Sequence, residues 1–173
     1  MPRLEIVRGD IIAETTDAIV NAANSSLLGG GGVDGAIHQA AGPALLDACR
    51  LVRAQRFPDG LPTGQAVATP GFALAARWVI HTVGPVYGVS PTPERDLARC
   101  HVASLAVADE LGARSVAFPA ISAGAYGYPI AEAARVALSA VRSAETHVEF
   151  VRFVLFNAEA YEAFVGVRVR TRS

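Results

Sequence analysis

The sequence predicts an α/β sandwich in which helices pack on a mostly parallel central sheet. Short strand-like runs alternate with longer segments of helical spacing along the whole chain. The chain has 173 residues, of which 51% are hydrophobic and 18% are charged, enough for one well-cored domain. Neither a linker nor an internal repeat interrupts the sequence, so we expect a single domain over residues 1–173.

Each element follows from the spacing of apolar residues. Short apolar or alternating runs predict strands at 4–8, 18–20, 65–69, 78–83, 115–118 and 151–156. Helical spacing predicts helices at 94–111, 130–144 and 158–165, and two more within 33–52 because Gly42-Pro43 interrupts that stretch. The arginine-rich residues from Gly166 to Ser173 are expected to fray.

The composition excludes several kinds of chemistry. All fifteen positive charges are arginine, so a Walker-type phosphate lysine, a Schiff-base lysine and a lysine general base are absent. The net charge of −1 gives no general reason to bind nucleic acid or a membrane.

Cys49 and Cys100 lie in apolar helical patterns and are expected to be reduced and buried. The histidines show no paired metal-ligand spacing, so we expect no metal and no cofactor, and the lack of a leader or a membrane span predicts a cytoplasmic protein.

The most informative segment runs from Asp17 to Gly42 and contains four consecutive glycines, Gly29 to Gly32, just before a helix. Glycines there let a ligand approach the backbone and expose N–H groups, which together make an anion site. Asp34 is the carboxylate in that site, and it could equally be the N-cap of the helix. His38 follows one turn later on the same helix face, where it either orients the loop or only packs.

A second loop, residues 119–129, also joins a strand to a helix and is rich in small residues. Ligands of open α/β sheets bind at the carboxyl ends of the strands, where both loops would lie and could hold two phosphates. Gly30, Gly32 and Gly35 fit a dinucleotide-binding fingerprint, but the strand before them ends near Asn21, too early for that motif.

Several single residues have both a structural and a functional interpretation. Asp10 suits a turn or a ligand contact, and the amides of Asn21 and Asn24 suit either loop hydrogen bonds or hydroxyl recognition. Tyr126 fits a surface turn or an aromatic contact to a sugar. Phe156, at a strand end, fits the core or a platform for a base.

Taken together, these segments resemble the macrodomain family, and specifically its hydrolytic branch of ADP-ribose-processing proteins. The resemblance covers nearly the whole chain in the right order, at residues 9–11, 20–24, 29–38, 63–64, 80–85 and 119–129. It implies a three-layer α/β/α fold with a mixed sheet that binds ADP-ribose at the strand ends. The second loop departs from the usual family sequence, with Ala123 and Ala125 in place of threonine and valine.

The resemblance also implies roles for particular residues. Asp10 and Ile11 would contact adenine, with Phe156 against the ring. Asn24 and Tyr126 would contact the distal ribose. The implied catalytic residues are Asp34, which supplies the carboxylate, and Asn24, with Asn21 and His38 in support. The implied ligand-binding set is Asp10, Ile11, Ala22, Gly31, Gly32, Val33, Ser122, Ala123, Gly124, Ala125, Tyr126 and Phe156.

The implied activity is removal of mono-ADP-ribose from glutamate or aspartate side chains and deacetylation of O-acetyl-ADP-ribose. Asp34 would orient or deprotonate the attacking water. In another route a ligand phosphate activates the water and Asp34 positions the sugar. The partners implied are ADP-ribose, O-acetyl-ADP-ribose and mono-ADP-ribosylated proteins, and a monomer would suffice. The rival functions are a reader module that binds without cleaving and an unrelated nucleotide phosphatase or nucleotide-binding enzyme.

Overall fold

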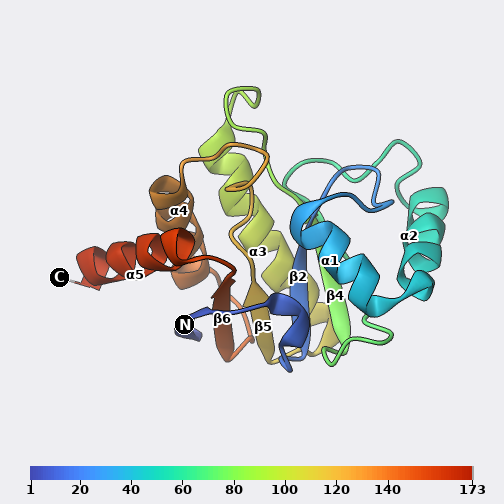
Figure 1. Cartoon of the computed structure of the whole chain (residues 1–173), viewed down its shortest axis with the longest axis horizontal. Helices are drawn as coiled ribbons and strands as arrows, with labels where there is room; N and C mark the ends of the chain where they lie inside the picture. The colour runs from blue at the N-terminus through green and yellow to red at the C-terminus, as the bar shows by residue number, and fades with distance from the viewer. Residues whose placement is uncertain (173) are drawn as a thin grey trace.

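A six-stranded sheet forms the middle layer of residues 1–172, which are the residues that the computed structural model describes (Figure 1). The strands are β1 (Arg3–Arg8), β2 (Ala18–Ala23), β3 (Ala66–Pro70), β4 (Trp78–Val83), β5 (Ser115–Phe118) and β6 (Phe150–Leu155). Their order in the sheet is β1-β6-β5-β2-β4-β3. The pairings are parallel except for the edge strand β3, which runs antiparallel to β4. The mixed sheet implied by the family resemblance is therefore confirmed.

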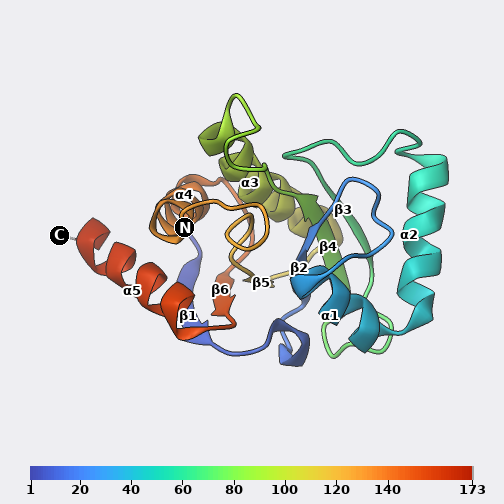
Figure 2. The ribbon, with the colours of Figure 1, turned by 45° about the horizontal axis from the view of Figure 1, so that its top comes forward.

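Helices cover both faces of the sheet. They are α1 (Gly32–Ala41), α2 (Pro43–Gln55), α3 (Pro93–Leu111), α4 (Ile130–Ser143) and α5 (Ala158–Arg172), with a short 3-10 helix η1 at Ile11–Ala13. In both views α1 and α2 lie on one side of the strands, away from α4 and α5 (Figures 1 and 2). The expected break at Gly42 separates α1 from α2, and Pro43 occupies the first position of α2, where its missing N–H costs nothing.

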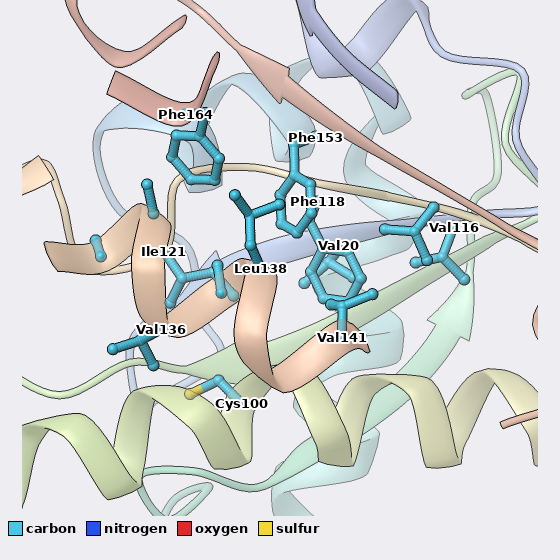
Figure 3. Packing of buried hydrophobic residues seen from close by; sticks show 14 of the residues in the cluster. Val20, Cys100, Val116, Phe118, Ile121, Val136, Leu138, Val141, Phe153 and Phe164 are labelled. Carbon is cyan, nitrogen blue, oxygen red and sulfur yellow. The ribbon is translucent and has the colours of Figure 1, made fainter. Parts of the chain in front are cut away.

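The two faces of the sheet carry separate hydrophobic cores. The core beneath α3, α4 and α5 includes Val20, Cys100, Phe118, Leu138 and Phe153 (Figure 3). The rings of Phe118 and Phe153 stack with centroids 5.7 Å apart, a geometry that adds roughly 0.5–1.5 kcal/mol to the stability gained from burial. The three-layer sandwich is thus held by one core on each side of the sheet.

The core beneath α1 and α2 is smaller and includes Ile19, Ile37, Leu45 and Cys49. Cys49 and Cys100 are both free and buried, as the sequence predicts. Along each strand side chains alternate between the two faces, so β2 gives Ile19 to this core and Val20 to the other.

The end of the chain differs from the expectation of a frayed tail. Helix α5 continues to Arg172 instead of ending near Val165. Phe164 and Val167 are buried against the core of α3 and α4, and Arg142 of α4 donates from Nη1 to Thr171 Oγ1 at 2.6 Å. Apolar contact on one face of the helix therefore extends it beyond the predicted end. Ser173, the last residue of the expected tail, lies outside the described residues.

Within residues 1–172, none of the helices has the length and apolar character needed to cross a membrane.

Candidate functional site

A cavity of about 690 Å³ opens at the carboxyl edge of the parallel strands. Residues that follow β1, β2, β5 and β6 line it, as do the N-terminal turn of α1 and Gly84 after β4. Parallel strands end at the same edge of a sheet, so five segments distant in sequence meet around one space. In Figure 1 the loop before α1 and the loop before α4 both lie above the strands.

The loop between β2 and α1 is held by contacts on both of its sides. Leu27 is buried although its backbone is left-handed, with φ of 60°, and its N–H donates to Asn24 O. Arg53 of α2 donates from Nη1 to Ser26 O at 2.8 Å. The side chain of Asn24 donates in turn to Gly29 O at 3.0 Å. These contacts fix the glycine run at the cavity wall.

Helix α1 begins at this wall without a side-chain cap. Its N-cap is Gly31, so Asp34 is not the N-cap and stands in the first turn of the helix instead. Because no side chain covers them, the first N–H groups of α1 can serve as donors to a bound anion. Of the two interpretations of Asp34 that the sequence leaves open, the N-cap is therefore wrong, and Asp34 lines the cavity.

Asp34 is buried, at 4% exposure, and its two carboxylate oxygens have different surroundings. Oδ1 accepts a hydrogen bond of 2.8 Å from Asn21 Nδ2 and lies 3.4 Å from His38 Nε2, close enough for an ion pair but without hydrogen-bond geometry. Oδ2 accepts no side-chain or capping hydrogen bond within the described part of the chain. The carboxylate is thus anchored through one oxygen, which leaves the other for the cavity.

Gly30 lies between Oδ2 of Asp34 and the amide of Asn24. A Cβ atom built at Gly30 would be 3.2 Å from Asp34 Oδ2 and 3.2 Å from Asn24 Nδ2. At Gly31, one residue further on, a Cβ would meet nothing within 4 Å. The side chains of Asn24 and Asp34 therefore lie close to the backbone at Gly30, whereas no other protein group lies close to Gly31.

The second loop, between β5 and α4, faces the glycine run across the cavity. Ser122 has a φ of 65°, and its buried Oγ has no partner among the described residues. Its carbonyl accepts from the N–H of Tyr128 at 2.9 Å, and the N–H of Tyr87 donates to Tyr126 O at 2.9 Å. A Cβ atom at Gly84, just after β4, would overlap the Ser122 hydroxyl and crowd Ile121, so a larger residue there would displace side chains of the second loop.

The far wall of the cavity comes from β1 and β6. Asp10 caps η1, since its Oδ1 accepts from the Ile12 N–H at 3.2 Å, and it also lines the cavity. The turn and ligand-contact interpretations of Asp10 are compatible. Phe156 is 78% exposed at the cavity rim and belongs to neither core, so the platform interpretation fits it.

The charges around the cavity are acidic. Asp10, Asp34 and Glu159 line it, and no basic side chain does so within residues 1–171. A phosphate would therefore meet the backbone N–H groups of the two loops rather than an arginine. Nor does any group of three or more His, Cys, Asp or Glu residues in the described chain lie close enough to hold a metal ion.

The structure gathers the predicted residues into one place. All twelve residues of the expected ligand-binding set line the cavity, as do Asn24 and Asp34, whereas Asn21 and His38 lie behind Asp34 and touch it from there. Sequence reasoning missed Gly84, Asn157 and Glu159 as lining residues. Asn157 lies in the short connection after β6 and Glu159 in the first turn of α5, so the rule that ligands bind at strand ends was the available signal.

Two buried residues lie further behind Asp34. His81 of β4 is completely buried and close to His38, and burial first, then that neighbouring histidine, lowers its pKa to about 3. Burial and the nearby charge of Asp34 raise the pKa of the Cys49 thiol to about 11. At neutral pH His81 is therefore an uncharged imidazole and Cys49 a thiol rather than a thiolate.

Comparison with known proteins gives a consistent result. A family model described as Macro domain matches residues 20–137. A macro domain-containing protein of Streptomyces coelicolor is 58% identical over 166 residues, which cover 96% of this chain and 98% of that protein. A protein of Salmonella typhimurium named O-acetyl-ADP-ribose deacetylase is 52% identical over 161 residues, which cover 91% of this chain and 89% of that protein.

Solved structures show the same likeness. A variant of the Oceanobacillus iheyensis macrodomain with ADPR matches with a TM-score of 0.94 and 47% identity, covering 98% of this chain and 93% of that one. The Trypanosoma brucei macrodomain in complex with ADP-ribose matches with a TM-score of 0.83 and 39% identity, covering 93% of this chain and 67% of that one.

Proposed function

Because this chain belongs to the macrodomain family, we propose that it binds ADP-ribose in the cavity and hydrolyses esters of the distal ribose. Its substrates would be O-acetyl-ADP-ribose and proteins that carry mono-ADP-ribose on glutamate or aspartate. The likeness to a protein named O-acetyl-ADP-ribose deacetylase supports the first substrate. The second contains the same kind of bond, an ester between a carboxyl group and a ribose hydroxyl.

The observation that carries the proposal is the asymmetric setting of Asp34. One of its oxygens is bound by Asn21, and the other stands beside Asn24 and Gly30 at the cavity wall. A reader module needs no buried carboxylate there, because a negative charge close to a diphosphate opposes binding of the ligand. A hydrolase uses such a carboxylate to hold or deprotonate water.

The ligand would lie across the strand ends. Adenine would lie against Phe156 with Asp10 at its edge, the diphosphate between the two glycine-rich loops, and the distal ribose beside Asn24. The backbone N–H groups at the start of α1 and in the loop of residues 122–126 supply donors for the diphosphate. This arrangement uses no cation and no cofactor.

In the reaction, water held by Asp34 adds to the ester carbonyl carbon while its proton passes to Oδ2. The bond between that carbon and the ribose oxygen then breaks, and the ribose oxygen leaves as a hydroxyl after it takes the proton back from Oδ2, which restores the Asp34 carboxylate. The products are ADP-ribose and a carboxylic acid, which ionises at neutral pH. General-base assistance of this kind contributes about 10²–10⁴-fold to a rate.

Replacing Asp34 by asparagine tests the proposal. Asparagine keeps an oxygen for the Asn21 hydrogen bond but removes the base, so we expect turnover of O-acetyl-ADP-ribose to fall by about 10²–10⁴-fold. Calorimetry should show that the Kd for ADP-ribose is kept or improved. Unchanged turnover in this variant would contradict the role of Asp34, and would favour activation of the water by a ligand phosphate.

The rival functions predict other results with the wild-type protein. A reader would bind ADP-ribose and release no product from either ester. A nucleotide phosphatase or a general nucleotide-binding enzyme would bind AMP or ATP about as tightly as ADP-ribose, which the same calorimetry compares.

A further inference from the structure

A row of polar side chains crosses the otherwise apolar core behind Asp34. Asn21 Nδ2 lies 2.8 Å from Asp34 Oδ1 and 3.1 Å from His81 Nδ1. His81 Nε2 in turn lies 2.9 Å from Thr69 Oγ1. The four residues come from α1, β2, β4 and β3, and none is more than 4% exposed. The row thus connects the edge strand of the sheet to the cavity carboxylate.

The sheet register explains how the row forms. Asn21 of β2 pairs with His81 of β4. Thr69 is the next-to-last residue of β3, which pairs with β4 on its other side. All three side chains point to the face covered by α1 and α2, where their neighbours along the strands are apolar. Polar groups in such a layer destabilise the fold unless they are hydrogen-bonded to each other.

The chemistry of the groups fixes the direction of each hydrogen bond. Carboxylate Oδ1 of Asp34 can only accept, so the amide nitrogen of Asn21 must face it. The second hydrogen of that nitrogen then points to His81 Nδ1, which must also accept. A neutral imidazole with an accepting Nδ1 carries its proton on Nε2, and this proton is donated to Thr69 Oγ1.

The row holds the Asn21 amide at two points. Its Oδ1 is buried and, in the described part of the chain, has no hydrogen-bond partner. Only the two N–H bonds therefore define the plane of the amide, one to α1 and one to β4. Without the acceptor at His81, the amide could turn about its side chain and carry Asp34 Oδ1 with it.

The other groups that face His81 do not replace these bonds. Cys49 Sγ of α2 lies 3.9 Å from Nε2, a weak contact beside the 2.9 Å contact to Thr69. The His38 ring of α1 is 6.5 Å away between centroids. Thr69 is therefore the main acceptor for the proton on His81 Nε2, and it holds the imidazole ring where Nδ1 meets Asn21.

From this geometry we infer that Thr69 and His81 are positioning residues, which orient Asn21 so that Asp34 presents Oδ2 to the cavity. The inference rests on the proposed function in so far as it concerns turnover. Neither residue lines the cavity, so they act on the reaction through Asn21 and not by touching the substrate.

The test replaces Thr69 by valine, which has the same shape but no hydroxyl, and by serine, which restores the hydroxyl. For Thr69→Val we expect turnover of O-acetyl-ADP-ribose to fall about tenfold because the carboxylate is misplaced. The Kd for ADP-ribose, measured by calorimetry, should stay within about twofold, since no residue of the cavity wall has changed. Thr69→Ser should recover most of the lost turnover. If Thr69 only stabilises the fold, the folded Thr69→Val protein should keep the wild-type turnover, even if its melting temperature is lower.

A nuclear magnetic resonance measurement on the protein needs no enzymatic activity. In the wild type, the ¹⁵N shifts of His81 should show a proton on Nε2 and none on Nδ1, and the side-chain N–H groups of Asn21 should exchange slowly with solvent. In Thr69→Val that exchange should become faster. A proton on Nδ1 of His81 in the wild type would overturn the inference even if the protein is an active hydrolase.

The two failures can be told apart. If the wild type hydrolyses neither ester, the proposed function fails, and the tautomer and the exchange rates still decide whether the row orients Asn21. If the wild type is active and Thr69→Val is equally active, the proposed function stands and the positioning role is wrong.

Discussion

Replacing Gly30 by alanine tests how strongly the rate of hydrolysis depends on the positions of Asn24 and Asp34. The new Cβ would lie 3.2 Å from both Asn24 Nδ2 and Asp34 Oδ2, inside the 3.4 Å at which ordinary van der Waals contact begins. Each polar group must therefore move away by about 0.2 Å. The glycine's own φ is not in the left-handed region, so the substitution adds no backbone strain there.

The size of the effect follows from this displacement. A misplacement of 1 Å can cost about 100-fold in rate, so 0.2 Å costs about 2.5-fold, and two such groups together about 6-fold. That loss equals about 1 kcal/mol of transition-state stabilisation. We expect it to appear in kcat, while the melting temperature changes little because both neighbours can move toward the cavity.

Gly31→Ala is the matched control, because a Cβ there meets nothing within 4 Å and its φ of −91° suits alanine. The assay compares initial rates of O-acetyl-ADP-ribose hydrolysis at saturating substrate for the two variants. Because Gly31 lines the cavity but its Cβ would displace neither Asn24 nor Asp34, we expect Gly31→Ala to raise KM and to lower kcat less than Gly30→Ala does. Equal kcat values in the two variants would refute the reasoning about Gly30.

Three further predictions concern the cavity rim, the second loop and the core. Phe156→Ala should leave the melting temperature unchanged, since the ring is 78% exposed, and should weaken ADP-ribose binding by about 1–3 kcal/mol through lost stacking, as calorimetry can show. Gly84→Ala should lower stability by about 1–3 kcal/mol, because its Cβ would lie 2.7 Å from Ile121 Cγ2, and chemical denaturation measures this. Burial lowers the pKa of His101 to about 4. In the unfolded chain His101 takes up a proton below about pH 6.5, so the free energy of unfolding should fall as the pH drops from 6.5 toward 4. His101→Phe should reduce that fall by up to about 3 kcal/mol, as melting curves recorded at several pH values can show.

The sequence predicts much of the architecture because local patterns determine it. Strand and helix positions follow from apolar spacing, and the glycine run before α1 indicates a segment that lines the cavity. The end of α5 could not be predicted in this way. Ala160, Phe164 and Val167 have helical spacing, but the arginines that follow suggest a solvated tail, and only contact with α4 shows that the helix continues.

The arrangement behind Asp34 is harder to predict from sequence. Thr69 and His81 look like ordinary members of strands, and nothing near them in sequence indicates Asn21, which lies 60 residues before His81. Their relation depends on which strands become neighbours and in what register. Sequence patterns indicate which side of a strand is buried, but not which strand lies beside it.

The pairing of β1 with β6 has a consequence for the order in which the cavity forms. In the sheet, β1 lies at the edge and its described strand partner is β6, whose residues begin at Phe150. Until that segment leaves the ribosome, β1 has no strand to join, and the cavity lacks the lining residues that follow β6. Contacts of such long sequence separation form late and slow the folding of a domain. We therefore expect the loop before α1 to be assembled on a partial sheet first, and a nascent chain to gain the cavity wall formed by β1 and β6 only after Leu155 has left the ribosome.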